Sequence, residues 1–310
     1  MIVELPHTTT AQVSKHLVSL REDGGAVALG RVLTLVISTE PGKEEDAIEA
    51  ANLASREHPM RVIVLSIPRE STNISNRLDA EIRIGGDAGA SEVVVLRAYG
   101  EVGSDQQGLV MGLLLPDAPV VTWWPQESPK VAALSPLGAI AQCRITDAFA
   151  QTDTDAALKQ LCLSYTPGDA DFAWTRLTLW RTQLAAVLDQ PPYESILSGH
   201  VTAAPGSPSA KLLTVWLQIQ LGVPIEFREK NTGERDGSIH EVVLTRPSGE
   251  IRLSRNNSTV ALLEQPGQPR HEITLARRTL RDCLAEELRR LDPDVVYGNV
   301  ISSAIDVLGL

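Results

Sequence analysis

The sequence predicts an α/β domain with a mostly parallel sheet, followed by an α+β domain that has an antiparallel meander and two terminal helices. The chain has 310 residues, which corresponds to about two domains. Strand-like and helix-like segments alternate in its first half, and short strand-like segments separated by turns dominate its second half. Because the composition changes between Ala148 and Asp171, we place the boundary near Tyr165, giving domains of residues 1–165 and 166–310.

The first domain alternates strands and helices. Residues 8–23 carry threonines ahead of apolar residues at helical spacing, which predicts an amphipathic helix. The apolar run at 30–38, the helix-like segment at 43–58 and the apolar run at 61–67 predict a β-α-β unit. Further strand candidates are "EIRIG", "EVVVLRAY", "VVTWW" and "QCRITDA", with the helix "DQQGLVMGLLL" between the second and the third. This alternation is Rossmann-like, without a dinucleotide fingerprint.

The second domain begins with helices and continues with strands. "FAWTRLTLWRTQLAAVL" and "SPSAKLLTVWLQIQL" have helical patterns, and Ser207 with Pro208 marks the start of the second helix. The segments "PIEFRE", "IHEVVLTR", "EIRLSR", "TVALLE" and "HEITLA" predict an antiparallel meander with one solvated face. Residues 276–291 predict an amphipathic helix, and Asp292 with Pro293 is expected to start a last helix that is buried on two sides.

Composition limits the classes of partner. Hydrophobic residues at 43% and charged residues at 22% describe a globular chain. Lys and Arg number 28 against 39 Asp and Glu, so the net charge is −11, which repels the phosphates of nucleic acids and anionic lipids. We therefore expect neither nucleic acid nor a membrane surface as a partner.

The sequence also favours a cytoplasmic location. The opening, "MIVELPHTTT", lacks the basic end and apolar stretch of an export signal. The most apolar windows are interrupted before they reach the roughly 20 residues of a membrane-spanning helix. Cys143, Cys162 and Cys283 are far apart, which favours reduced structural thiols over a disulfide framework or a zinc site.

No catalytic motif is evident. The chain has no G-x-G, and its glycines at 25 and 30 are not followed by the lysine and hydroxyl of a P-loop. G-x-S-x-G is also missing, and the His-Glu pairs at 240–241 and 271–272 lack a second histidine at the spacing of a zinc helix. The sequence therefore predicts no catalytic residue, no metal site and no cofactor.

One loop supports an alternative function. In "GGDAGASEV", Gly85 to Val93, the backbone amides are able to open toward an anion at the sheet edge. A plain turn between two strands explains the same residues and is favoured by about four to one. The alternative is a sugar-phosphate- or nucleotide-binding α/β enzyme that uses the loop from Gly85 to Gly89.

Two adjacent tryptophans end an apolar run at Val120 to Pro125, "VVTWWP". Successive side chains of a strand point to opposite faces, so Trp123 and Trp124 cannot share one core layer. We expect one of them to be inside and the other to be exposed, at a ligand mouth or on a partner surface.

A second stretch, "DADFAWTRLTLWRTQ", interleaves tryptophan and arginine. On a helix, Trp180 falls on the core stripe, whereas Trp174 and Arg181 fall on a neighbouring face. The latter pair suits a cation-π contact or an interface patch. Burial of Trp174 at the domain junction is favoured over that patch by about two to one on the residues alone.

Four segments, "LPDAPVVTWWP", "DFAWTRLTLWR", "SAKLLTVWLQIQL" and "CLAEELRRLDPD", together resemble the OpcA family, the glucose-6-phosphate dehydrogenase assembly proteins. The resemblance covers nearly the whole chain in the same order. It implies a non-catalytic partner that binds glucose-6-phosphate dehydrogenase and supports its assembly or activity. Through that enzyme it implies a role in NADPH production by the oxidative pentose phosphate pathway.

The family motifs also indicate candidate residues for partner binding or for the domain junction. These are Trp123, Trp124, Trp174, Arg176, Trp180, Arg181, Arg289, Arg290 and Asp292. The exposed member of the tryptophan pair, with the Trp174 helix, is the expected contact or junction surface. Thioredoxin-type regulation is not implied, because the three cysteines are distant from one another. A structural component of another complex is a third interpretation.

Overall fold

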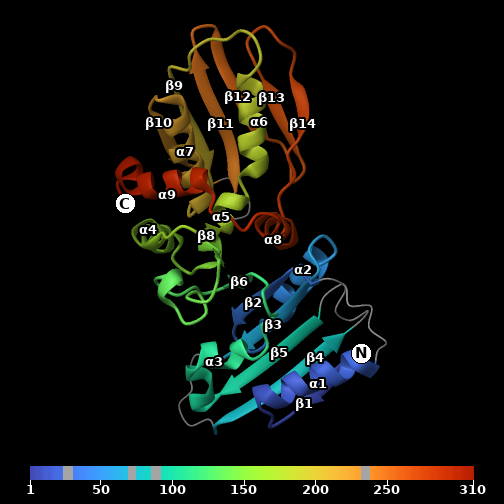
Figure 1. Ribbon diagram of the computed structural model, residues 1–310. Helices are drawn as coiled ribbons and strands as arrows, with labels where there is room; N and C mark the ends of the chain where they lie inside the picture. The colour runs from blue at the N-terminus through green and yellow to red at the C-terminus, as the bar shows by residue number, and fades with distance from the viewer. Residues whose placement is uncertain (24–30, 69–74, 85–91, 232–237) are drawn as a thin grey trace. The chain divides into compact units, whose positions relative to one another are not determined.

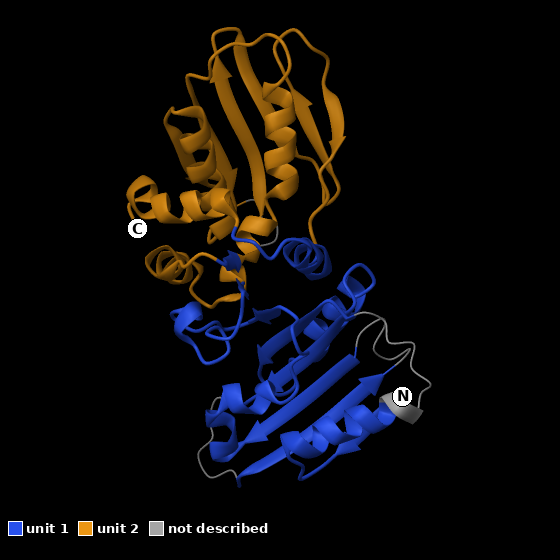
Figure 2. Cartoon of the chain, in the orientation of Figure 1, with its two compact units in different colours: residues 1–146, 168–170, 279–293 blue, residues 147–167, 171–278, 294–310 orange. Residues whose placement is uncertain are grey.

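The computed structural model describes residues 1–310 except 24–30, 69–74, 85–91 and 232–237 (Figure 1). The chain forms two compact units, coloured separately in Figure 2. Unit 1 comprises residues 1–146, 168–170 and 279–293, and unit 2 comprises residues 147–167, 171–278 and 294–310. The predicted division into domains of residues 1–165 and 166–310 stays a prediction.

Unit 1 is built on a mostly parallel sheet, as predicted. Its strands lie in the order β1-β4-β5-β3-β2-β6-β7-β8, in which β5, β3, β2, β6 and β7 are parallel and β1 and β4 add an antiparallel edge. The strands are β1 (Ile2–Leu5), β2 (Leu33–Thr39), β3 (Met60–Ser66), β4 (Arg77–Ile84), β5 (Glu92–Tyr99), β6 (Val120–Trp123), β7 (Cys143–Thr146) and β8 (Asp169–Asp171).

Helices and loops cover both faces of this sheet. On one face, apolar residues of α1, α3 and the segment 132–141 form a core with Val36 and Ile63. On the other face, the Ser66 hydroxyl at the end of β3 reaches Glu44 at the start of α2, and α8 packs on α2. The helices are α1 (Thr10–Asp23), α2 (Glu45–Ala54), α3 (Gln106–Met111) and α8 (Leu280–Arg289), with 3-10 turns η2 (Gly100–Ser104) and η3 (Ala132–Leu134).

Unit 2 has a second sheet in the order β10-β9-β11-β12-β13-β14. Residues of α6, α7 and α9 form a core with one face of this sheet, and its opposite face carries charged pairs such as Arg252 with Glu241. The strands are β9 (Ser198–Ala203), β10 (Ile225–Glu229), β11 (Ile239–Arg246), β12 (Gly249–Arg255), β13 (Val260–Glu264) and β14 (His271–Thr274). The helices are α4 (Thr154–Ser164), α5 (Phe172–Thr175), α6 (Thr178–Leu188), α7 (Pro208–Leu221) and α9 (Val295–Leu308), with the 3-10 turn η4 (Ala148–Ala150).

Most local predictions for unit 2 are confirmed, with three corrections. Strands β11 to β14 form the predicted antiparallel meander, but β10 lies outside it and pairs in parallel with β9. The predicted helix at 172–188 is interrupted after Thr175, where Leu177 N–H donates to the carbonyl of Trp174 in a tighter turn. The last helix is capped by Asp294 and not by Asp292, because the Asp294 carboxylate accepts two backbone N–H groups of its first turn.

Candidate functional site

The parallel strands of unit 1 reverse their order at one point. Across the sheet, β5, β3, β2, β6 and β7 are the third, second, first, fourth and fifth parallel strands of the chain (Figure 1). The order therefore reverses between β2 and β6. Open α/β sheets bind ligands beyond the carboxyl ends of their strands at such a point. Thr39 and Trp123, the last residues of β2 and β6, mark this position.

Side chains link the two strand ends at this position. The Thr39 hydroxyl donates to Gln126 Oε1 at 2.7 Å. The Thr122 hydroxyl donates to the Leu137 carbonyl at 3.0 Å, which ties the segment after β6 back to the strand. The carboxyl ends of β2 and β6 are thus joined by polar side chains of the chain itself.

Both tryptophans of the pair are buried. Trp123 is 0% exposed and Trp124 is 4% exposed, so the prediction that one of them is exposed is wrong. They do point to opposite faces: Trp124 joins the core of α1 and α3, whereas Trp123 is in register with Ile37 on the other face. Because both faces of the sheet are covered, both directions lead into the interior.

The N-terminus of α2 carries acidic side chains. This helix follows β2, so in dinucleotide-binding folds its amides would face a phosphate. Here Glu44 accepts a hydrogen bond from Ser66 at 2.8 Å, and Glu45 accepts two from Arg83 at 2.9 and 2.6 Å. Carboxylates already occupy the positive end of the helix dipole and repel phosphate. These residues do not fit a dinucleotide at this position.

An ion network extends from these acids across β4 and β5. Glu81 accepts hydrogen bonds from Arg83 at 2.5 Å and from Arg97 at 2.9 Å. Burial is the largest single influence on the pKa of Glu81 and raises it, but the bonds to the two arginines together lower that pKa below its ordinary value. The pKa of Glu45 is also lowered, chiefly by its hydrogen bond from Arg83. The cluster therefore stays ionised with its charges matched.

The loop proposed for the alternative function, Gly85 to Gly89, lies outside the described residues. Its flanking residues are described: Ile84 ends β4 and lies opposite Glu92, which begins β5 in an antiparallel pair. Glu92 is 0% exposed and accepts a hydrogen bond from Arg61 at 2.9 Å. The described part of this region places a buried, paired carboxylate next to the loop.

Trp174 holds two elements of unit 2 together. Its indole Nε1–H donates to Asp294 Oδ2 at 2.9 Å, and the other carboxylate oxygen caps the first turn of α9. The Arg181 guanidinium lies 3.8 Å from the Trp174 ring centroid, as the predicted cation-π pair requires. Tyr297 packs against the same ring, with centroids 5.8 Å apart. At 3% exposure, Trp174 contributes to packing and presents almost no surface to a partner.

Arg176 and Trp180 also contact residues of their own unit. Arg176 makes two hydrogen bonds to the carboxylate of Asp147, at 2.7 and 2.6 Å. Trp180 is 3% exposed, and its ring lies 5.4 Å from the Arg255 guanidinium. Sequence reasoning missed Asp147 and the cap Asp294, because single aspartates in connecting segments have no spacing that distinguishes them from solvated loop residues.

The remaining candidates lie on the surface of unit 1, at and just beyond the end of α8. Arg289, Arg290 and Asp292 are exposed. Arg289 lies 3.3 Å from Glu57, but both side chains are largely solvated, so this pair contributes little to stability. The opposite side of α8 is buried through Cys283 and Leu284. These three charged residues are the accessible members of the predicted set, and their role in partner binding stays a prediction.

The described cysteines have the properties of structural thiols. Burial raises the pKa of Cys143 to about 12 and that of Cys162 to about 11, so both are protonated at neutral pH. Cys283 is buried on α8. Among the described residues, no three His, Cys, Asp or Glu side chains are grouped to hold a metal ion. The same residues contain no helix long and apolar enough to cross a membrane.

Two OpcA family models match the chain in sequence order. The first describes the N-terminal domain of a glucose-6-phosphate dehydrogenase subunit and matches residues 51–162. The second describes the C-terminal domain of the same kind of protein and matches residues 167–301. Together they cover most of the sequence. A search of curated proteins finds no match to this chain.

Solved structures show distant likenesses. A mutant of KijD10, a 3-ketoreductase from Actinomadura kijaniata in complex with TDP-benzene and NADP, is 12% identical over 90% of this chain and 96% of that chain, with a TM-score of 0.49. A myo-inositol dehydrogenase from Lactobacillus casei in complex with NAD(H) and myo-inositol is 10% identical over 89% and 93% of the two chains, with a TM-score of 0.39. Likenesses of this strength do not bear on function.

The bond between Trp174 and Asp294 predicts a measurable loss of stability. Trp174→Phe removes the indole donor, and we expect the free energy of unfolding to fall by about 1 kcal/mol, the net contribution of a typical hydrogen bond, because the exposed Asp294 carboxylate can bind water in place of the indole. Trp180→Phe, at a tryptophan with the same 3% exposure, controls for the lost ring volume. Urea denaturation compares the variants, and equal losses would contradict a special role for the bond.

The ion network predicts a pH-dependent stability. Since the folded-state pKa of Glu81 is below its ordinary 4.5, the ionised carboxylate stabilises the fold above that pH, and this contribution is lost as pH falls through the lowered pKa. We expect Glu81→Gln to lower the melting temperature at about pH 7, with the difference from wild type vanishing as the pH falls through the lowered pKa. Glu272→Gln, on an exposed residue of β14, is the control. A difference that stays constant with pH would contradict the assignment.

Proposed function

Because the chain belongs to the OpcA family of glucose-6-phosphate dehydrogenase assembly proteins, we propose that it is a non-catalytic protein that binds this dehydrogenase and promotes its active oligomer. The observation that carries the proposal is the ordered match of both family models over most of the chain. By acting on that enzyme, the protein would support NADPH production in the oxidative pentose phosphate pathway of the cytoplasm.

The chemistry at the strand ends of unit 1 supports a non-catalytic role. The fold has the strand order of nucleotide-binding sheets, but acidic residues stand at the helix end where a phosphate would bind. The Thr39–Gln126 bond joins the two strands at the point where their order reverses. Both features favour a role in binding the dehydrogenase over a role in binding its cofactor.

The proposed mechanism is linkage between binding and assembly. A protein that binds the active oligomer more tightly than the inactive form shifts the equilibrium toward the active oligomer by that difference in affinity. A tenfold difference corresponds to about 1.4 kcal/mol, so a small interface contribution is sufficient. This mechanism requires no catalytic residue on this chain.

The burial of the tryptophans changes where we place the contact surface. Trp123, Trp124, Trp174 and Trp180 are each at most 4% exposed, so they support the fold behind any interface. The exposed charges at the end of α8 are the accessible motif residues. We therefore propose that Arg289, Arg290 and Asp292 contribute to dehydrogenase binding.

The proposal predicts a kinetic effect. With purified glucose-6-phosphate dehydrogenase from the same organism, adding this protein should change the rate of NADPH formation or the apparent substrate affinity, and the change should saturate at a fixed stoichiometry. If neither the rate nor co-elution changes, the proposed function is rejected. A melting temperature raised by sugar phosphates or nucleotides near their Kd would instead favour the alternative of a ligand-binding enzyme.

The placement of the contact surface predicts a selective loss of binding. Arg290→Glu reverses one exposed charge and should weaken binding to the dehydrogenase by about threefold to tenfold, with a larger effect at low salt. Arg270→Glu makes the same charge change at a side chain that is 75% exposed in unit 2. Titration calorimetry at two salt concentrations measures both variants. Equal affinity for the two would remove the α8 end from the proposed surface.

A further inference from the structure

Among the described residues, strand β10 is an edge strand of the sheet in unit 2. It pairs with β9 on one side, and β9 continues to β11 (Figure 1). Lys230, the residue after β10, directs its N–H toward β9, where it donates to the Ala203 carbonyl at 2.8 Å. Alternate residues of a strand direct their backbone groups to opposite sides. The odd-numbered residues of β10 therefore direct their N–H and C=O groups away from β9.

Within the described residues, the outward backbone groups of Phe227 and the N–H of Glu229 are available for strand pairing. Ile225 N–H faces the side-chain oxygen of Gln218 at 3.4 Å. In the described part of the chain, no backbone or side-chain group bonds the outward N–H and C=O of Phe227 or the N–H of Glu229. An edge of this kind is a template for a further strand.

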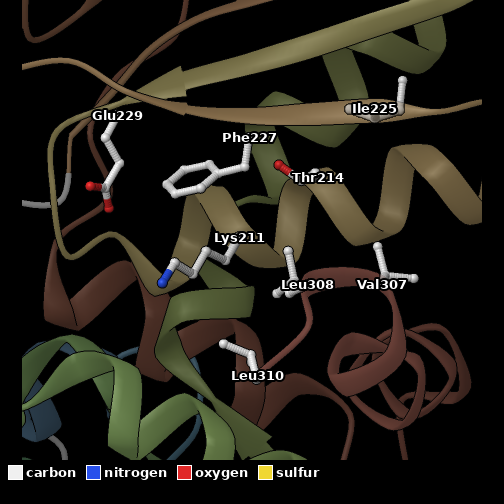
Figure 3. Close-up of a pocket in the computed structure, with 8 residues that line it drawn as sticks. All are labelled: Lys211, Thr214, Ile225, Phe227, Glu229, Val307, Leu308 and Leu310. Atoms are coloured by element: carbon white, nitrogen blue, oxygen red, sulfur yellow. The ribbon is translucent and has the colours of Figure 1, made fainter.

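A cavity lies beside the same edge. Its volume is about 410 Å³, within the range of cavities that bind small molecules. Figure 3 shows the side chains that line it: the alternate residues of β10, two residues of α7 and the end of the chain. The lining residues are Lys211, Thr214, Ile225, Phe227, Glu229, Val307, Leu308 and Leu310. The residues that direct backbone groups outward thus also line the cavity.

The charges that line the cavity argue against an anionic ligand. Lys211 is 8% exposed, and its ammonium bonds Asp155 Oδ1 at 2.7 Å while lying 5.7 Å from the Phe227 ring centroid. Because Asp155 already balances this buried charge, the lysine does not call for an anionic ligand. The rest of the lining combines five aliphatic or aromatic side chains with the polar Thr214 and Glu229.

The charged residues on and near β10 indicate which kind of segment would pair with this strand. Arg228 is paired with Glu226 at 2.5 Å on the solvated side of β10, whereas Glu229 lines the cavity. A second copy of this chain would bring the same acids and another −11 of net charge to the edge. A segment that carries a Lys or Arg is more complementary to this edge than a second copy.

We propose that β10 and its cavity bind an extended segment of the partner dehydrogenase. The segment adds a strand beside β10, inserts an apolar side chain next to Phe227 and Leu308, and places a basic residue near Glu229. Backbone hydrogen bonds supply affinity and the cavity supplies specificity, as in other cases of strand addition. This inference rests on the proposed function, because it takes the dehydrogenase as the partner.

Two pairs of variants test the inference in the full-length chain. Glu229→Pro removes an outward N–H without removing a bond to β9, and Leu308→Trp fills the cavity. Glu272→Pro is the control for the first, because Leu275 N–H faces β13, so the N–H of Glu272 faces outward at the opposite edge of the sheet. Leu163→Trp, at a side chain that is 65% exposed on α4, is the control for the second. Circular dichroism and melting temperature select variants that remain folded.

We expect Glu229→Pro and Leu308→Trp each to weaken dehydrogenase binding by about tenfold or more, and the controls to stay within about twofold. If wild type binds and all four variants bind equally, the edge is rejected and the proposed function stands. If wild type does not bind the dehydrogenase, both are rejected. A self-associated dimer that Glu229→Pro abolishes while dehydrogenase binding is unchanged would overturn the inference in favour of a second copy.

Discussion

Coverage of both faces of the parallel strands is the constraint on which unit 1 depends. All seven residues of β3 are buried, and its backbone pairs with β2 and β5 on its two sides. Any charge on these strands must then be matched inside the protein. Arg61 on β3 meets this requirement through Glu92 at 2.9 Å and the Leu113 carbonyl at 2.5 Å. The same coverage places Trp123 and Trp124 in the interior on opposite sides of β6.

A sheet with the strand order of nucleotide-binding proteins here carries different chemistry at its carboxyl ends. Function depends on the residues placed on a fold and not on the fold alone. At the start of α2, Glu44 and Glu45 take hydrogen bonds from Ser66 and Arg83, in the place where glycine amides would meet phosphate. The positive helix end thereby stabilises the chain's own carboxylates. A scaffold of this kind is compatible with a protein that acts by binding another protein.

In unit 2, the family-motif residues maintain the arrangement of its helices. Trp174 joins α5 to the cap of α9, and Arg176 joins α5 to Asp147 before η4. Trp174 and Asp147 are buried, so the indole N–H and the carboxylate that they contribute each need a partner in place. The end of α9 also lines the cavity beside β10, which is an edge strand among the described residues.

Elements whose signals are local could be predicted from the amino-acid pattern alone. The apolar runs of β2 and β3, the start of α7 at Ser207 and Pro208, and the opposed directions of Trp123 and Trp124 follow from spacing and capping alone. Three features emerge only in the folded chain: both tryptophans are buried, β10 pairs with β9, and Asp294 bonds Trp174 as well as capping α9. Periodicity reports which side of an element is apolar, but coverage of the other side and bonds between residues 120 positions apart depend on distant segments meeting in space.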